Sequence, residues 1–157
     1  MFTRDKFTDE EWRVVELGAL SAGAGVMMAD FGVVSVLKEA AALAEGFHKL
    51  KEEYPDSQLV QALSVEKNQQ IATANQPHQK REPAKETAER MLRQVEAGAR
   101  LVESKVPEAE ARAYKEFTYA LAEKVANASG EGWFGLGKKV SDDEDAYLGE
   151  IRKELRM

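Results

Sequence analysis

Cysteine is absent from this sequence of 157 residues, and histidine occurs only twice. Without cysteine the chain can form no disulfide, no thiolate metal site and no cysteine nucleophile. The two histidines, His48 and His78, do not stand in a pattern that predicts a hydrolytic triad. The sequence therefore predicts no catalytic residue and no cofactor, and we expect a protein that is not an enzyme.

Basic residues are outnumbered, with 22 Lys and Arg against 28 Asp and Glu, and the formal net charge is −6. Binding to a phosphate backbone requires a concentrated basic face, and no segment of this chain concentrates Lys and Arg in that way. We therefore expect no nucleic-acid partner. The first residues, MFTRDKFTDEEW, are acidic and lack the apolar core of a secretory signal, so a cytoplasmic protein is expected.

Long aliphatic runs are scarce, and the most apolar segment, Leu17 to Leu37, is rich in Gly, Ala and Ser. Its 21 residues reach the length of about 20 that a membrane-spanning helix needs. Asp30 within it would cost on the order of 3 kcal/mol in the bilayer centre, and small side chains compensate little. We therefore expect no membrane span. The segment is predicted to be an interior helix, or two half-helices meeting near Asp30.

Helix signals dominate the rest of the chain, and the alternation typical of strands is nearly absent. Thr8 and Glu11 stand at the positions of a capping box, with Phe7 and Trp12 at the two staple positions, so a helix is expected from Thr8 to about Asp30. Further helices are expected over 33–53, from Asp56 or Ser57 to about Ile71, and then over 83–102, 107–128 and 141–155. Five to six helices with short connections predict an all-α, antiparallel helical bundle.

A polar segment without periodicity, residues 75–82, contains Pro77 and is followed directly by Pro83. It is the best linker candidate, separating two helical halves. The length of the chain is nevertheless that of one ordinary domain, so residues 1–157 are expected to form a single helical domain.

A Gly-rich loop, SGEGWFGLGKKVS, contains two patterns that bind phosphate in other proteins, G-x-x-x-x-G-K and G-x-G-x-x-G. In the first pattern Lys139 replaces the magnesium-binding Ser or Thr, and a helix rather than a strand is expected before the loop. The favoured interpretation is that Trp133 and Phe134 close one end of the bundle. A ligand site remains the alternative, with these candidate residues: Gly132, Trp133, Phe134, Gly135, Gly137 and Lys138.

Glu45 and His48 form a Glu-x-x-His pair, the spacing that supplies two metal ligands from one helix in di-iron bundles. A di-iron site needs a second such pair and two further glutamates, which the sequence does not offer. A solvated surface pair is the favoured interpretation, and no metal site is predicted.

Some of these motifs resemble a bacterial family of small helical proteins without an assigned activity. The resemblance is carried by F-T-x-E-E-W near the start, by Ala29-Asp30 with Gly32, by Lys38-Glu39, and by the W-F-G-L-G loop within 132–141. The family more often has Asp-Pro-Ser-Gly where this chain has Asp30-Phe31-Gly32. The resemblance implies a compact helical fold and transfers no catalytic residue.

The functional expectation is a helical bundle that acts through protein contacts, as a homo-oligomer or an adaptor, because apolar helix faces are present and no convergent polar site is visible. The alternative is a small-ligand or metal binder that uses the Gly132 to Lys139 loop or the pair Glu45 and His48.

Overall fold

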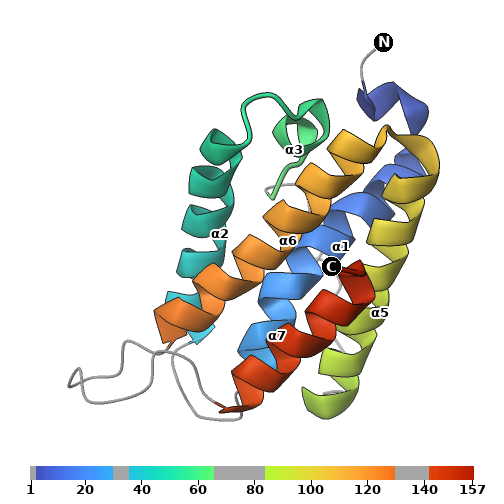
Figure 1. Cartoon of the computed structure of the whole chain (residues 1–157). Coiled ribbons are helices and arrows are strands. Elements are labelled where there is room, and N and C mark those ends of the chain that lie inside the picture. The colour runs from blue at the N-terminus through green and yellow to red at the C-terminus, as the bar shows by residue number, and fades with distance from the viewer. Residues whose placement is uncertain (1–2, 30–35, 66–83, 130–141) are drawn as a thin grey trace.

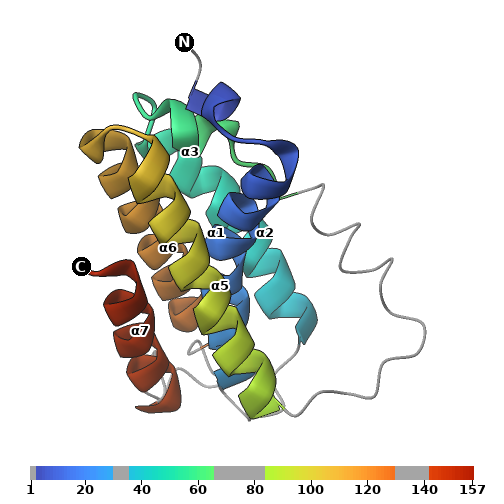
Figure 2. The same cartoon turned by 90° about the vertical axis from the view of Figure 1, so that its right-hand side faces the viewer.

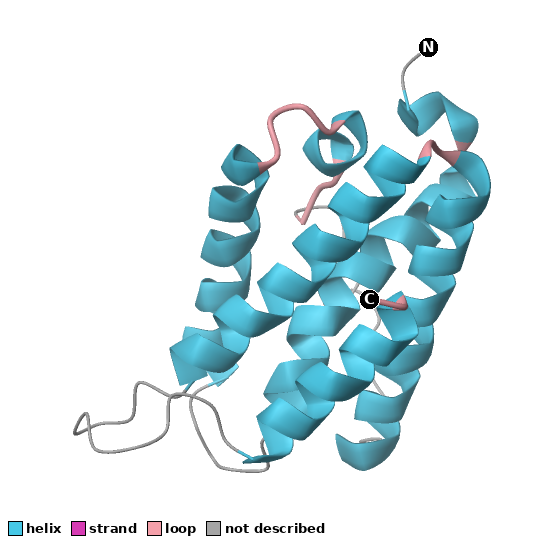
Figure 3. Ribbon diagram, viewed as in Figure 1, coloured by secondary structure: helices cyan, strands magenta, loops and turns pink. Residues whose placement is uncertain are grey.

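The computed structural model describes residues 3–29, 36–65, 84–129 and 142–157. These residues form a 3-10 helix, η1 (Thr3–Lys6), and the α-helices α1 (Asp9–Ala29), α2 (Val36–Glu53), α3 (Gln58–Ala62), α5 (Ala84–Lys105), α6 (Glu108–Ser129) and α7 (Asp142–Leu155). Figure 3 shows only helices, loops and turns in the described part of the chain. The predicted all-α helical bundle is confirmed.

Helix α1 lies in the middle of the bundle and contacts α2, α5, α6 and α7 (Figures 1 and 2). It is antiparallel to α5: Glu11 near the start of α1 forms an ion pair of 2.7 Å with Lys105 at the end of α5. The small α3 packs on α6 and η1. The prediction that the segment from Leu17 contributes an interior helix is confirmed for residues 17–29.

The start of α1 has the predicted geometry. The backbone N–H of Thr8 donates to Glu11 Oε2 at 2.8 Å, and the N–H of Glu11 donates to Thr8 Oγ1 at 3.2 Å. The rings of Phe7 and Trp12 meet edge to face with centroids 5.6 Å apart. Both side chains are buried, so the staple ties the entry of α1 to the core.

The third helix was predicted wrongly in its length. Ser57 caps α3 as expected, since its Oγ accepts the N–H of Val60 at 3.1 Å. The helix ends at Ala62, because Leu63 is extended with ψ 143°, whereas a helix to about Ile71 was expected. Burial explains the difference: Leu63 and Val65 both enter the core, and an extended segment can direct both side chains there. Tertiary packing has overridden the helical periodicity.

Several expectations fall outside the described residues. These are the turn around Asp30, the linker at 75–82, Pro83 as the first residue of a helix, and Ser141 as a helix cap. They stay predictions.

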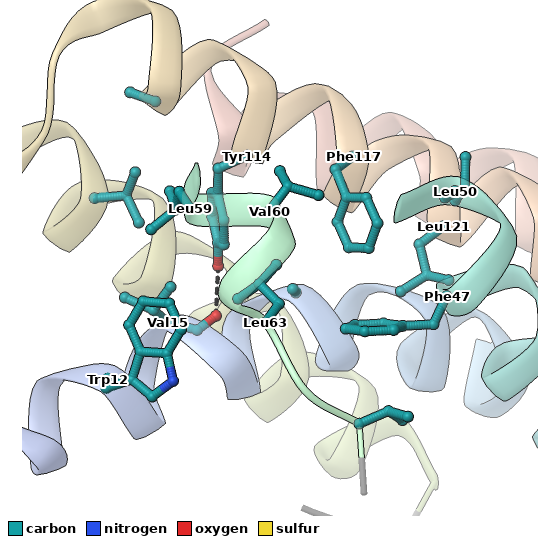
Figure 4. Close-up of a cluster of buried hydrophobic side chains, with 14 of the residues drawn as sticks. Trp12, Val15, Phe47, Leu50, Leu59, Val60, Leu63, Tyr114, Phe117 and Leu121 are labelled. Carbon is teal, nitrogen blue, oxygen red and sulfur yellow. Dashed lines mark hydrogen bonds between the residues drawn. The ribbon is translucent and has the colours of Figure 1, made fainter. Parts of the chain in front are cut away.

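Two clusters of buried side chains form the core. Figure 4 shows the larger one, in which α1, α2, α3 and α6 bring together the rings of Phe47 and Phe117 and the aliphatic side chains of Val15, Leu59 and Leu121. The second lies at the other end of α1, where the bundle gains α7, and contains Val26, Val95, Val125, Ile151 and Leu155. In the described segments, no helix is long and apolar enough to cross a bilayer.

Candidate functional site

The Gly-rich loop lies outside the described residues, and with it the candidates Gly132, Trp133, Phe134, Gly135, Gly137 and Lys138. Both interpretations of this loop, a closure of the bundle and a ligand site, therefore stay predictions.

Glu45 and His48 lie on α2, and both side chains are exposed. The Glu45 carboxylate forms an ion pair with Lys49, whose hydrogen bond and charge lower the pKa of Glu45. The His48 ring meets the edge of Phe47 with centroids 6.1 Å apart. Among the residues that the structure describes, no three His, Cys, Asp or Glu side chains are grouped so that they could hold a metal ion.

Two carboxylates at the α1, α3 and α6 contacts bind backbone groups. Glu110 of α6 accepts the Ser57 hydroxyl at 2.6 Å and the N–H groups of Gln58 and Leu59 at 3.1 Å each. Glu16 of α1 accepts the N–H of Ser64 at 3.2 Å. Glu110 therefore satisfies N–H groups that are open at the start of α3, and Glu16 satisfies an N–H group of the extended segment after α3, so the two carboxylates attach both parts to the bundle.

Two buried tyrosines also bind backbone groups of neighbouring helices. The Tyr114 hydroxyl donates to the carbonyl oxygen of Val15 at 2.7 Å (Figure 4), and the Tyr147 hydroxyl donates to that of Ala88 at 2.8 Å. Burial raises the pKa of both phenols far above the usual range. Both groups stay neutral donors at physiological pH and link helices to one another.

Two hollows in the surface of the described part are of modest size. The first, about 330 Å³ between α5 and α6, is lined by charged side chains that already pair with one another, Lys115 with Glu103 at 3.0 Å and Arg112 with Glu108 at 2.8 Å. The second, about 260 Å³ beside the turn from Tyr54 to Ser57, contains Glu110, which holds α3. The charged side chains that line the first hollow are therefore engaged in ion pairs, and Glu110 in the second is engaged in hydrogen bonds to the start of α3.

Two of the exposed large apolar side chains, Val14 and Leu17, lie on α1 where it crosses α5. On α1, Val14, Leu17 and Ser21 follow the spacing i, i+3, i+7, which places them on one face of a helix. On α5, Gln94, Ala97 and Leu101 follow the same spacing. We call these six residues the α1–α5 outer face.

A hydrogen bond shows that the two rows lie side by side. Ser21 is buried, and its Oγ donates to Gln94 Oε1 at 2.6 Å, so the two rows are adjacent at this point. Val14 and Leu17 are each 37% exposed, Ala97 is exposed and Leu101 is half-buried. Val14, Leu17 and Ala97 are therefore exposed apolar side chains on two adjacent helices, with Leu101 half-buried beside them.

Sequence reasoning expected apolar helix faces available for contacts but did not single out these residues. The spacing of Val14 and Leu17 was visible, but it is the same as that of core positions. Only the position of α5 shows that Val14 and Leu17 point away from the core.

Comparison of the chain with models of protein families, with curated proteins and with solved structures finds no match.

Proposed function

We propose that this protein acts through protein contacts made by the α1–α5 outer face, as a self-associating bundle or an adaptor. The observation that carries the proposal is the exposure of Val14 and Leu17 beside Ala97, on two helices that otherwise form the centre of the fold. Removing such side chains from water stabilises a complex by about 25 cal/mol per Å² of apolar area before the cost of association.

The hydrogen bonds that the buried and half-buried polar side chains make support the same proposal. Glu16, Glu110, Tyr114 and Tyr147 all bind the backbone of neighbouring elements. Within the described segments, every buried side-chain nitrogen and oxygen has a hydrogen-bond partner. These groups stabilise the bundle, and a reaction or a polar ligand would need groups that converge on a cavity instead. A cytoplasmic location is part of the proposal, since a chain without cysteine gains nothing from an oxidising compartment.

Because the chain has no cysteine, a single introduced thiol can test the proposed contact surface. Leu17→Cys and Ala146→Cys each create a single thiol that can carry a photo-crosslinker, at the outer face or at an exposed position on α7. We expect the crosslinker at position 17 to yield a discrete protein adduct, of this chain with itself or with another protein, and the crosslinker at 146 to yield none. Equal or absent adducts at the two positions would refute the proposal.

A further inference from the structure

We infer that residues 57–65 form a strap that opens independently of the helical bundle and uncovers an apolar groove between α1, α2 and α6. The strap consists of Ser57, the short helix α3 and the residues 63–65 that follow it. Figure 1 shows α3 at one end of the bundle, between α2 and α6. The strap is separate from the α1–α5 outer face, so this inference does not depend on the proposed function.

The strap fills a space that α1 and α2 leave between them. These two helices meet at Gly23 of α1 and Leu43 of α2, because a Cβ on Gly23 would collide with the Leu43 side chain. Nearer the start of α1, the strap side chains of Leu59, Val60 and Leu63 are buried in one cluster with residues of α1, α2 and α6 (Figure 4): Val15, Phe47 and Phe117. When the strap leaves, the apolar side chains of the three helices border a groove.

Side chains of four other elements hold the strap by hydrogen bonds: Thr3 of η1, Glu16 of α1, Lys51 of α2 and Glu110 of α6. Lys51 Nζ donates to the carbonyl oxygen of Leu63 at 2.8 Å, and the Thr3 hydroxyl donates to Gln58 Oε1 at 3.2 Å. The bonds of Glu16 and Glu110 are those described above. All of these bonds are exposed or half-buried, so water can replace either partner when one of them breaks.

The bonds that join the long helices do not involve the strap. The Tyr114 and Tyr147 hydroxyls link α6 to α1 and α7 to α5 through buried hydrogen bonds. Tyr54, which precedes the strap, packs edge to face on Phe117 with ring centroids 6.0 Å apart, so the end of α2 stays attached to α6. The bundle therefore keeps these contacts while the strap is open.

The balance of burial and entropy favours opening of the strap as a unit. Opening exposes its apolar side chains, and the conformational entropy that the released residues regain offsets part of this cost. A single helical turn is marginal without its packing, so α3 loses its helix together with its contacts. Segments held by surface hydrogen bonds open locally at a lower free energy than the whole fold.

The experiment compares two buried thiols. Val60 lies in the strap and Val95 lies on α5, and neither side chain is exposed in the folded protein. Because the chain has no cysteine, Val60→Cys and Val95→Cys each carry a single thiol, whose rate of reaction with a maleimide measures how often the site opens. We expect the thiol at position 60 to react at least about tenfold faster than the thiol at position 95. Urea unfolding of both variants allows the rates to be compared at equal global stability.

A second substitution tests the attachment to α6. Glu110→Gln leaves one carbonyl oxygen in place of the carboxylate, so it is expected to raise the rate at position 60 at least about tenfold and to leave the rate at position 95 unchanged. Glu108→Gln is the matched control on α6: its carboxylate pairs with Arg112 at the surface, and the change is expected to alter neither rate. Equal rates at positions 60 and 95, or a Glu110→Gln change that affects both positions equally or neither, would overturn the inference, because the strap would then open only with the whole bundle or would not be held by Glu110.

Discussion

Gly18 of α1 and Gly98 of α5 lie backbone against backbone. A Cβ built on Gly18 would be 3.0 Å from the Cα of Gly98, and one built on Gly98 would be 3.1 Å from the Cα of Gly18. The Tyr114 hydroxyl closes this crossing, at 2.7 Å from the first of these Cβ positions and 2.6 Å from the second. Because neither residue has a side chain, the backbones of α1 and α5 can approach closely. The same lack of side chains leaves room for the buried hydrogen bond of the Tyr114 hydroxyl.

The first prediction concerns this crossing. Gly18→Ala should destabilise the fold by about 1–3 kcal/mol, because the methyl group meets backbone atoms of α5 that cannot move alone. Gly149→Ala on α7 is the matched control: no atom lies within 4 Å of its Cβ position, and alanine should stabilise the helix by about 0.5–1 kcal/mol. Urea unfolding measures both. If both substitutions raise or both lower the free energy of unfolding, α1 and α5 do not approach as closely as described.

Tyr114→Phe should cost about 1 kcal/mol at neutral pH, since it removes the hydrogen bond to the Val15 carbonyl and keeps the ring. Burial raises the pKa of Tyr114, so the unfolded state ionises at about pH 10 while the folded state stays neutral. The stability from this group is complete below pH 10 and is lost as the pH rises above that value. The variant should therefore lose less stability than the wild type between neutral pH and strong alkali, as unfolding curves on both sides of pH 10 would measure. A parallel loss in the two proteins would contradict the buried position of the phenol.

The entry to α1 gives the third prediction. Thr8→Ala removes one half of the capping box and should cost about 1 kcal/mol. Trp12→Ala removes a buried ring that contacts Phe7 and should cost about 3 kcal/mol or more. Denaturant unfolding measures both. Two variants within about 0.3 kcal/mol of the wild type would show that the start of the helix is misplaced.

The same capping box should be sensitive to acid. In the folded state, the hydrogen bonds from Lys105 and from the N–H of Thr8 lower the pKa of Glu11 below its usual value of 4.5. Because the pKa of Glu11 is lower in the folded state, the stability that its charge contributes is complete above about pH 4.5. It is lost as the pH falls through the pKa of the folded state. Glu11→Gln should therefore be less stable than the wild type at neutral pH, with a difference that shrinks below pH 4.5 and disappears in stronger acid. Thermal unfolding across this range measures it, and a difference that is constant with pH would disprove the role of the charge.

The start of α1 and the fold class could be predicted from the sequence because their causes are local. The hydrogen bonds of Thr8 and Glu11 join residues three positions apart, and the apolar stripe of α5 follows helical periodicity, with Ala88, Val95 and Val102 buried as expected. The length of α3 could not be predicted, because it depends on the burial of Leu63 among residues that are distant in sequence.

The outer face could not be predicted for a related reason. Leu17 and Val15 are both aliphatic residues of one helix, and only the positions of α5 and α6 decide that Val15 is buried and Leu17 is exposed. The Gly-rich segment was expected to form an interior helix, but the residue that Gly18 meets, Gly98, is decided by the assembled bundle.

The most direct test of the account is the rate at which a thiol at position 17 reacts with a maleimide as the protein concentration rises. Leu17→Cys and Ala146→Cys report on the outer face and on an exposed control position in a chain that has no other cysteine. If the outer face self-associates, the reaction at position 17 slows markedly with increasing protein concentration, while the reaction at position 146 does not change. Equal rates at both positions over the whole concentration range would contradict it, because a covered face must protect its central residue.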